Sequence, residues 1–213
     1  FTDGYGALSS VNTPRPSYNP EAARQLFAAM GYTKQGPDGI LCKEDGTRLS
    51  FKLTYTPSDK TETLFTVLAQ GAKACGLELV ADAQPWQNVA DKVNAGTHEL
   101  LFWAAAPSSL LPQPERFLHS TATGTDAPFR LKSEEMDAAL RECYTAASSY
   151  DLGQAVARVD TMVYNLAIWA PGWKEDRAHV AAWDYVRFPK RYGGPYDIME
   201  SHTFWIKQKK SEE

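Results

Sequence analysis

Residues 48–81 read RLSFKLTYTPSDKTETLFTVLAQGAKACGLELVA, and this segment decides the fold of the chain. Apolar and polar residues alternate over 48–55, which predicts a strand with one buried face. Residues at helical spacing from about Lys60 to Cys75 predict a helix that Gly76 stops, and residues 77–81 read as a short strand. A strand, a helix and a strand in this order predict parallel strands joined by a right-handed crossover. The face expected to be buried in the first strand carries Leu49, Phe51, Leu53 and Tyr55, and the helix stripe carries Leu64, Phe65, Leu68, Ala72 and Cys75.

Upstream of this unit the sequence predicts a helix and a hairpin. Asn19 can cap a helix in which Pro20 takes the first position, and Gly31 can end it. One apolar face of that helix must lie against something, and its residues are Ala23, Leu26, Phe27 and Met30. Asp45-Gly46 is a strong turn signal between apolar runs over 39–43 and 48–55, so these two runs are expected to pair as a hairpin.

Downstream of residue 81 we expect a short helix near 86–94, ended by Gly96, and a further strand over 98–103. Two helices joined at 148–150 then read as an antiparallel pair that packs on the sheet. Their apolar stripes carry Met136, Leu140, Cys143 and Ala147 in the first helix, and Leu152, Val156, Val159 and Val163 in the second. Short strands are expected at 167–170 and 179–186, with a last apolar run at 203–206.

Composition excludes several partners. The chain has 213 residues, with 22 basic against 26 acidic side chains and a net charge of −4. No basic stripe interleaved with aromatics is present, which argues against nucleic acid, and the longest apolar stretch, 100–107, is too short to span a bilayer. Cys42, Cys75 and Cys143 have no metal-binding spacing; we expect buried unpaired thiols, with a Cys42–Cys75 bridge as the alternative.

The ordered series of elements from residue 18 to Trp103 resembles a known family. NPEAARQLFAAMGY at 19–32, DGIL at 38–41, the Asp45-Gly46 turn and ACGLEL at 74–79 are similar to the extracellular solute-binding proteins of family 5. These are the dipeptide-, oligopeptide- and nickel-binding components of bacterial ABC importers. The resemblance covers about residues 15 to 190, and its order and spacing carry more weight than any single motif.

The resemblance implies an α/β fold: a periplasmic-binding-protein-like lobe with a mixed sheet flanked by helices, the C-terminal lobe of a two-lobed protein. Residues 1–17 would be a linker or hinge remnant, residues 18–184 the ligand-binding lobe, and residues 185–213 a tail that returns to the missing N-terminal lobe. We therefore expect a piece of a longer protein. Without that lobe, Phe204 and Trp205 are expected to be exposed, swapped between copies or folded back.

A ligand is expected in the cleft at the carboxyl ends of the strands. Aromatic side chains there can stack on a solute, hydroxyls can bond a peptide backbone, and cations can hold a carboxylate. The candidates are Trp103, Ser108, Ser109, Arg116, Trp169, Lys174 and Arg177. Where peptide binders of the family commonly carry an Asp after the terminal Trp, this chain has Ala104-Ala105-Ala106-Pro107, which weakens a simple short-peptide assignment. Glu115 could replace that charge, or the ligand could lack a free ammonium group at this point.

The leading hypothesis is an exported solute-binding protein that captures a peptide or peptide-like solute and delivers it to an ABC permease in the membrane. Its location would be periplasmic or extracellular, with or without a lipid anchor. We expect no enzyme activity, cofactor or metal, because no nucleophile elbow, metalloprotease motif or phosphate loop occurs. The rivals are a hydrolase that uses acidic residues around Glu115 and Asp176, and a protein-interaction module that docks through Trp173, Trp183 and Trp205.

Overall fold

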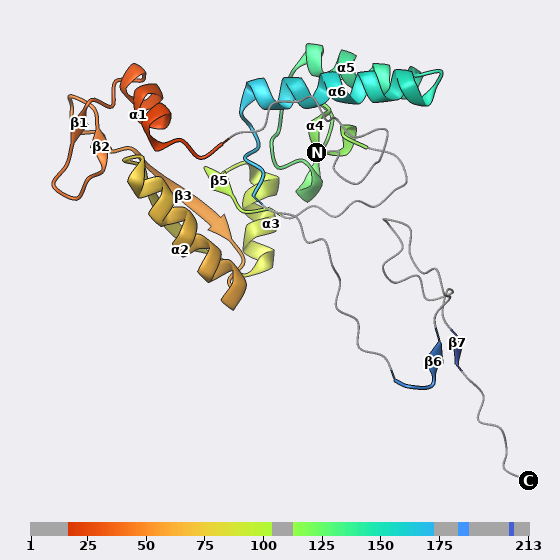
Figure 1. Ribbon diagram of the computed structural model, residues 1–213, viewed down its shortest axis with the longest axis horizontal. Coiled ribbons are helices and arrows are strands. Elements are labelled where there is room, and N and C mark those ends of the chain that lie inside the picture. The colour runs from red at the N-terminus through yellow and green to blue at the C-terminus, as the bar shows by residue number, and fades with distance from the viewer. Residues whose placement is uncertain (1–16, 104–112, 173–182, 188–204, 207–213) are drawn as a thin grey trace, which may run out of the picture. The chain divides into compact units, whose positions relative to one another are not determined.

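The computed structural model describes residues 17–103, 113–172, 183–187 and 205–206. Its helices and strands follow the α/β order expected from the sequence (Figure 1). The strands are β1 (Lys34–Gln35), β2 (Leu41–Cys42), β3 (Ser50–Tyr55), β4 (Glu78–Ala83), β5 (Leu100–Leu101), β6 (Val186–Arg187) and β7 (Trp205–Ile206). The helices are α1 (Pro20–Ala29), α2 (Asp59–Ala74), α3 (Trp86–Ala95), α4 (Glu115–Leu118), the short 3-10 helix η2 (Gly124–Asp126), α5 (Glu134–Thr145) and α6 (Ser149–Leu166).

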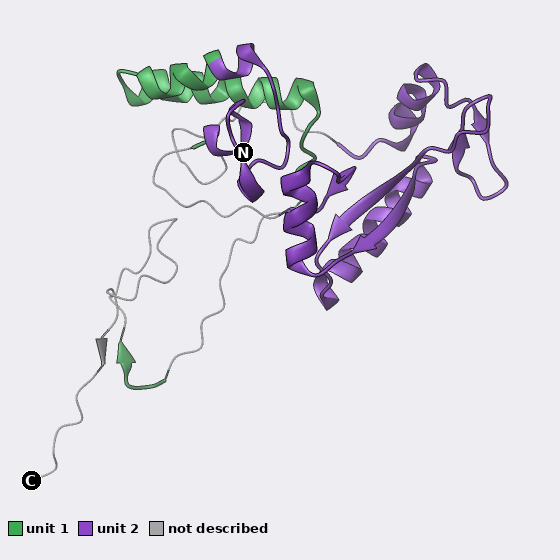
Figure 2. Ribbon diagram, turned by 180° about the vertical axis from the view of Figure 1, so that it is seen from behind, with its two compact units in different colours: residues 1–14, 106–114, 138–213 green, residues 15–105, 115–137 purple. Residues whose placement is uncertain are grey.

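The chain divides into two compact units, coloured in Figure 2. Residues 15–105 and 115–137 form one unit, which contains the sheet, and we call it the sheet unit. Residues 1–14, 106–114 and 138–213 form the other, which we call the helical unit. The expected division into 1–17, 18–184 and 185–213 stays a prediction.

The sheet unit is built on three parallel strands in the order β4-β3-β5. The parallel pairing of β3 with β4 confirms the crossover predicted from residues 48–81, and all six residues of β3 lie in register with β4. The antiparallel pairs β1-β2 and β6-β7 are separate from this sheet. In the β6-β7 pair, Val186 lies opposite Ile206 and Arg187 opposite Trp205. Phe204 lies outside the described residues, and the expectation for Phe204 and Trp205 stays a prediction.

Helices cover both faces of the sheet, as the contacts of two consecutive residues of β3 demonstrate. Tyr55 stacks on Phe65 of α2 with 5.5 Å between ring centroids. Thr54 points to the opposite face, where it bonds Asp82, which in turn pairs with Lys92 of α3. The layers are therefore α2, sheet and α3, the arrangement that right-handed crossovers to strands on either side of β3 require.

Local signals set the helix ends. The Asn19 side chain accepts from the amide of Ala22 at the start of α1, and Gly31 follows that helix with a φ of 90°. Ser58 and Thr61 form a reciprocal capping box on α2. Gly96 ends α3 in the left-handed conformation with a φ of 67°. These ends confirm the predicted bounds of all three helices to within a residue or two.

In the helical unit, α6 follows the predicted stripe more closely than α5 does. Val156, Val159 and Val163 of α6 are buried, and Glu142 of α5 forms an ion pair with Arg158 of α6 at 2.7 Å. Leu140 is buried as predicted, whereas Ala147 lies beyond the end of α5 and is exposed. The stripe therefore ends one turn earlier than its spacing suggested.

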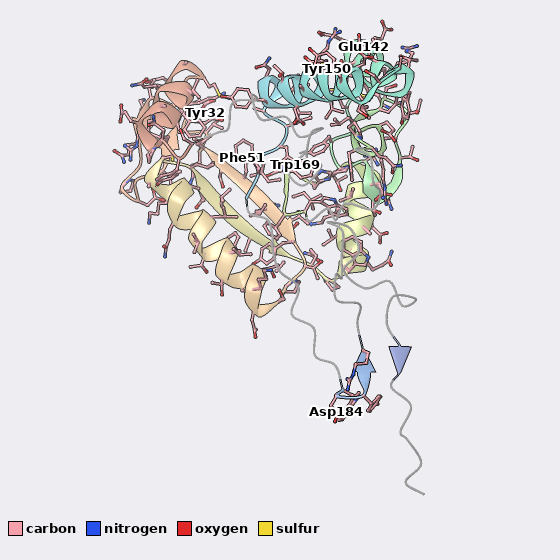
Figure 3. The ribbon with its side chains drawn as sticks, turned by 45° about the vertical axis from the view of Figure 1, so that its right-hand side comes forward. Tyr32, Phe51, Glu142, Tyr150, Trp169 and Asp184 are labelled. Atoms are coloured by element: carbon pink, nitrogen blue, oxygen red, sulfur yellow. The ribbon has the colours of Figure 1, made fainter. Side chains whose placement is uncertain are left out.

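Several expectations about burial were wrong. Leu26 and Met30 of α1 are largely exposed, and Arg24 of the same helix donates to the carbonyl of Ala74 at the end of α2 at 2.9 Å. Phe51, labelled in Figure 3, is exposed because β5 pairs with β3 only at Leu53 and Thr54. Leu68 of α2 is also exposed. The three cysteines, Cys42, Cys75 and Cys143, are half-buried rather than buried.

Three expected strands and one hairpin also differ. The strand expected over 98–103 is limited to Leu100–Leu101, and the one expected at 167–170 is irregular chain after α6. Of the strand expected over 179–186, the structure describes residues 183–186, where Asp184 and Tyr185 form a turn and only Val186 belongs to a strand, β6. The predicted turn at Asp45-Gly46 forms, but 39–43 and 48–55 meet through a single bridge between Cys42 and Arg48, and β2 pairs instead with β1.

Candidate functional site

Aromatic and polar side chains gather at the carboxyl edge of the three-stranded sheet. Strands β3, β4 and β5 are parallel, so their last residues, Tyr55, Ala83 and Leu101, lie along one edge. The chain leaves β4 through Gln84 into α3, and it leaves β5 toward Trp103. Edges of this kind are the usual ligand sites of open α/β sheets.

Two tryptophans stack at this edge. Trp86 is the first residue of α3, Trp103 follows β5 by two residues, and their ring centroids lie 5.6 Å apart with 29° between the planes. Trp103 is half-buried, whereas 53% of Trp86 is exposed. We call Trp86 and Trp103 the tryptophan pair. Sequence reasoning identified Trp103 and missed Trp86, although its place at the start of the helix predicted near 86–94 was an available signal.

A polar network holds the base of this edge. The carboxylate of Asp82 accepts from the Thr54 hydroxyl at 2.7 Å, from the Gln84 amide at 2.9 Å and from the ammonium of Lys92. The hydrogen bond from Lys92, followed by the one from Thr54, lowers the pKa of Asp82 from 3.8 to about 2. The opposite charges of Asp82 on β4 and Lys92 on α3 are therefore paired with each other.

The turn between β4 and α3 is fixed by further hydrogen bonds. The backbone amide of Gln84 donates to the carbonyl of Tyr55 at 2.9 Å, and the Asn88 amide donates to the side-chain oxygen of Gln84 at 3.2 Å. Pro85, with a φ of −54°, precedes Trp86. These bonds and Pro85 thus restrict the backbone of the turn that leads into Trp86.

Tyr55 ties the end of β3 to α2. Its hydroxyl donates to the carboxylate of Glu62 at 3.0 Å, and its ring is buried against Phe65. Burial, with the hydrogen bond to Glu62 as the second cause, raises the pKa of Tyr55 above its ordinary value. This side chain is part of the scaffold beneath the edge rather than a group presented at the surface.

The remaining predicted site residues divide into two groups. Arg116 lies on α4 in the sheet unit, is exposed, and binds the carboxylate of Asp126 at 2.7 Å, so it could hold a solute carboxylate only by sharing or exchanging that partner. Trp169, labelled in Figure 3, is half-buried in the helical unit after α6. Four candidates, Ser108, Ser109, Lys174 and Arg177, lie outside the described residues.

The residues invoked by the rival hypotheses are only partly described. Glu115 is half-buried at the start of α4, while Asp176 and Trp173 lie outside the described residues. Trp183 is 73% exposed and stacks on Tyr185 with 6.3 Å between ring centroids. Within the described ranges, no group of three or more His, Cys, Asp or Glu side chains is placed to hold a metal ion, and no helix is long and apolar enough to cross a bilayer.

Comparison with known families gives a match over more than half of the chain. Residues 2–129 match the sequence model described as bacterial extracellular solute-binding proteins, family 5 Middle. Among curated proteins, a probable ABC transporter-binding protein of Deinococcus radiodurans is 36% identical over 67 residues, which are 31% of this chain and 11% of that protein. The oligopeptide-binding protein AppA of Bacillus subtilis is 29% identical over 85 residues, which are 39% of this chain and 16% of AppA.

Solved structures show the same fold. AppA in complex with a nonapeptide aligns with a TM-score of 0.72 and 16% identity, over 94% of this chain and 40% of AppA. A periplasmic oligopeptide-binding protein of Thermotoga maritima, solved with bound mannohexaose, aligns with a TM-score of 0.68 and 14% identity, over 79% of this chain and 33% of that one. The chain thus spans well under half the length of these relatives.

Proposed function

The chain belongs to family 5 of the bacterial extracellular solute-binding proteins, and from this premise we propose that it is part of a protein that captures a peptide or peptide-like solute outside the cytoplasm and delivers it to an ABC permease. The family match over residues 2–129 carries the proposal. Two relatives point to the same class, since one is named an ABC transporter-binding protein and the other an oligopeptide-binding protein.

The carboxyl edge of the sheet supports binding rather than chemistry. The tryptophan pair presents aromatic surface, while Asp82 is occupied by three hydrogen-bond donors. A carboxylate held in this way at a pKa of about 2 is a poor general base near neutral pH, because its affinity for a proton is too low. Retention of the solute would rest on stacking and hydrogen bonds, and turnover is not part of the proposal.

In this proposal residues 18–184 form one jaw of a two-lobed protein, and residues 185–213 return to the other lobe. The residues proposed to contact the solute are Trp103, Ser108, Ser109, Arg116, Trp169, Lys174 and Arg177. Closure of the two lobes would exclude water from the solute. The coverage of 40% of AppA is consistent with a second lobe supplied by further sequence.

Isothermal titration calorimetry tests the proposal on the protein expressed from its complete reading frame. A panel of dipeptides to nonapeptides, with oligosaccharides as the comparison class, is expected to give micromolar or tighter binding for at least one peptide. A matched sample of residues 18–184 alone is expected to bind in the millimolar range or not at all, since half a cleft loses contacts and closure. Absence of binding to every peptide in the panel would refute the ligand class.

A further inference from the structure

We propose that β4 is a docking edge for a second copy of this chain, and that the two copies pair their Glu78–Ala83 strands antiparallel about a two-fold axis at Ala81. The inference goes beyond the capture of a solute and does not depend on it. Three observations support it: the open side of β4, the pairing of its charges within one copy, and a register that opposes no like charges.

The first observation is that one side of β4 has open hydrogen-bonding groups. β4 lies at the end of the strand order β4-β3-β5, and within the described residues it pairs with β3 alone. The backbone N–H groups of Glu78 and Gln84 donate to carbonyls on the β3 side. Backbone groups of successive residues in a strand point to alternate sides. Those of Leu79, Ala81 and Ala83 therefore point away from β3.

This side of the strand is also accessible and unprotected. Ala81 and Ala83 are exposed, and Val80 is 39% exposed. Edge strands that proteins keep apart often carry a proline, a bulge or an unpaired charge. Glu78–Ala83 contains no proline, and all six of its residues lie in register with β3, so the strand has no bulge. Two of the usual barriers to edge-to-edge pairing are therefore missing.

The second observation is that both charges of β4 are paired within one copy. Arg48 binds the carboxylate of Glu78 at 3.2 Å, and Lys92 binds that of Asp82. Without these cations, each copy would bring two carboxylates to the shared edge, and their repulsion would oppose association. Because each carboxylate has its own cation, the two strands can approach without a net repulsion between them.

The third observation is the register that a two-fold axis at Ala81 produces. In an antiparallel pair, residues whose backbone groups point toward the partner strand exchange hydrogen bonds. No pair in this register opposes two like charges. The pairs, written with the residue of the second copy last, are Ala81 with Ala81, Leu79 with Ala83, Val80 with Asp82, and Glu78 with Gln84.

Neighbouring registers are less favourable. An axis at Ala83 would place Pro85, which has no N–H group, opposite Ala81. An axis at Leu79 would place Ala83 beyond the start of β4 in the second copy. Only the axis at Ala81 pairs all three residues whose backbone groups point outward.

Pairing in this register would join the two three-stranded sheets into one continuous sheet. The two copies of β4 run in opposite directions, so the carboxyl edges of the two sheets lie at opposite ends of the joined sheet. The tryptophan pairs of the two copies therefore lie far from each other. Association through β4 would leave both candidate sites open to a solute.

Sedimentation velocity on the protein expressed from its complete reading frame tests the inference. A dimer is expected to appear as the concentration rises from low micromolar to submillimolar. Ala81→Asp and Ala81→Lys each place two like charges directly opposite at the axis, so each variant alone is expected to dimerise about tenfold more weakly. An equimolar mixture of the two variants is expected to restore the dimer, because the two new charges are then opposite in sign.

Ala28→Asp is the matched control, since it adds the same charge at an exposed alanine of α1. It is expected to leave the dimer unchanged. Hydrogen exchange of the unmodified protein gives a second readout that needs no substitution. The amides of Leu79, Ala81 and Ala83 are expected to exchange more slowly at the higher concentration, whereas the amide of Val80, which points to β3, is expected to change little. This readout decides the question if either Ala81 variant fails to fold by circular dichroism.

Several results would overturn the inference. One is a monomer at every concentration, and another is a dimer that both Ala81 variants leave unchanged. A third is an equimolar mixture of folded variants that stays monomeric, and a fourth is equal exchange of the outward amides at low and high concentration. None of these results bears on solute capture, which the calorimetric panel tests separately.

Discussion

Replacing Asp82 by Asn tests whether the network at the carboxyl edge stabilises the sheet unit. In the folded chain the Asp82 side chain is 14% exposed, and its carboxylate accepts from Lys92, Thr54 and Gln84. Its pKa falls from 3.8 to about 2 on folding. At 1.36 kcal/mol for each unit of pKa, the ionised carboxylate contributes about 2 kcal/mol, reduced somewhat because Lys92 is 34% exposed. Asn keeps the shape and loses the charge that Lys92 requires.

The sign of the pH dependence follows from the lowered pKa. The contribution of Asp82 is complete above the unfolded pKa of about 4, and it is lost as the pH falls toward 2. Urea unfolding at pH 7 is therefore expected to give a free energy of unfolding about 1 to 2 kcal/mol lower for Asp82→Asn, and the difference is expected to shrink between pH 4 and pH 2. Asp91→Asn on the exposed side of α3 is the control, expected to change stability by less than about 0.5 kcal/mol. Equal stability of Asp82→Asn and the unmodified chain at pH 7, or a difference that persists at pH 2, would refute this reasoning.

Two further substitutions test the fold. Gly76 and Gly46 have φ values of 86° and 87°, but an added Cβ would lie 2.5 Å from a side-chain carbon of Leu41 at Gly76 and would have nothing within 4 Å at Gly46. Thermal unfolding is therefore expected to show Gly76→Ala less stable than Gly46→Ala by about 1 to 3 kcal/mol. Equal losses of stability in the two variants would argue against close packing around Gly76. In an absorbance titration at 295 nm, Tyr55→Phe is expected to remove a tyrosine that ionises above the ordinary range, because burial and the bond to Glu62 raise its pKa; loss of an ordinary titration step instead would contradict that burial.

Features with a local cause were predictable from the sequence. Asn19 and Gly31 bracket α1, and Gly96 ends α3, because capping and left-handed backbone depend on neighbours in the chain. The parallel pairing of β3 and β4 follows from their separation by one helix, which forces a crossover. The family, and with it the fold class, could be inferred from the order of these local elements.

Features that depend on distant partners were less predictable. Met30 lies on an apolar stripe, yet it is exposed, because burial of a stripe depends on which other elements pack against it and not on its spacing alone. Phe51 fits the alternation of β3 but lies outside the short register with β5. Trp86 gained its significance only from Trp103, a residue 17 positions away that the sheet brings to the same edge. The hydrophobic periodicity of a single segment does not predict which residues of a distant segment it will contact.

The strands on the two sides of β3 pair with it over different lengths, so the two members of the tryptophan pair are held with different rigidity. Six residues of β3 pair with β4, which leads directly to Trp86, whereas only two pair with β5, which leads to Trp103. Amide hydrogens along β5 should therefore exchange with solvent well before those of β4, since fewer bonds must open to release them. Trp86 is therefore expected to be held firmly at this edge, and Trp103 is expected to adjust its position more readily.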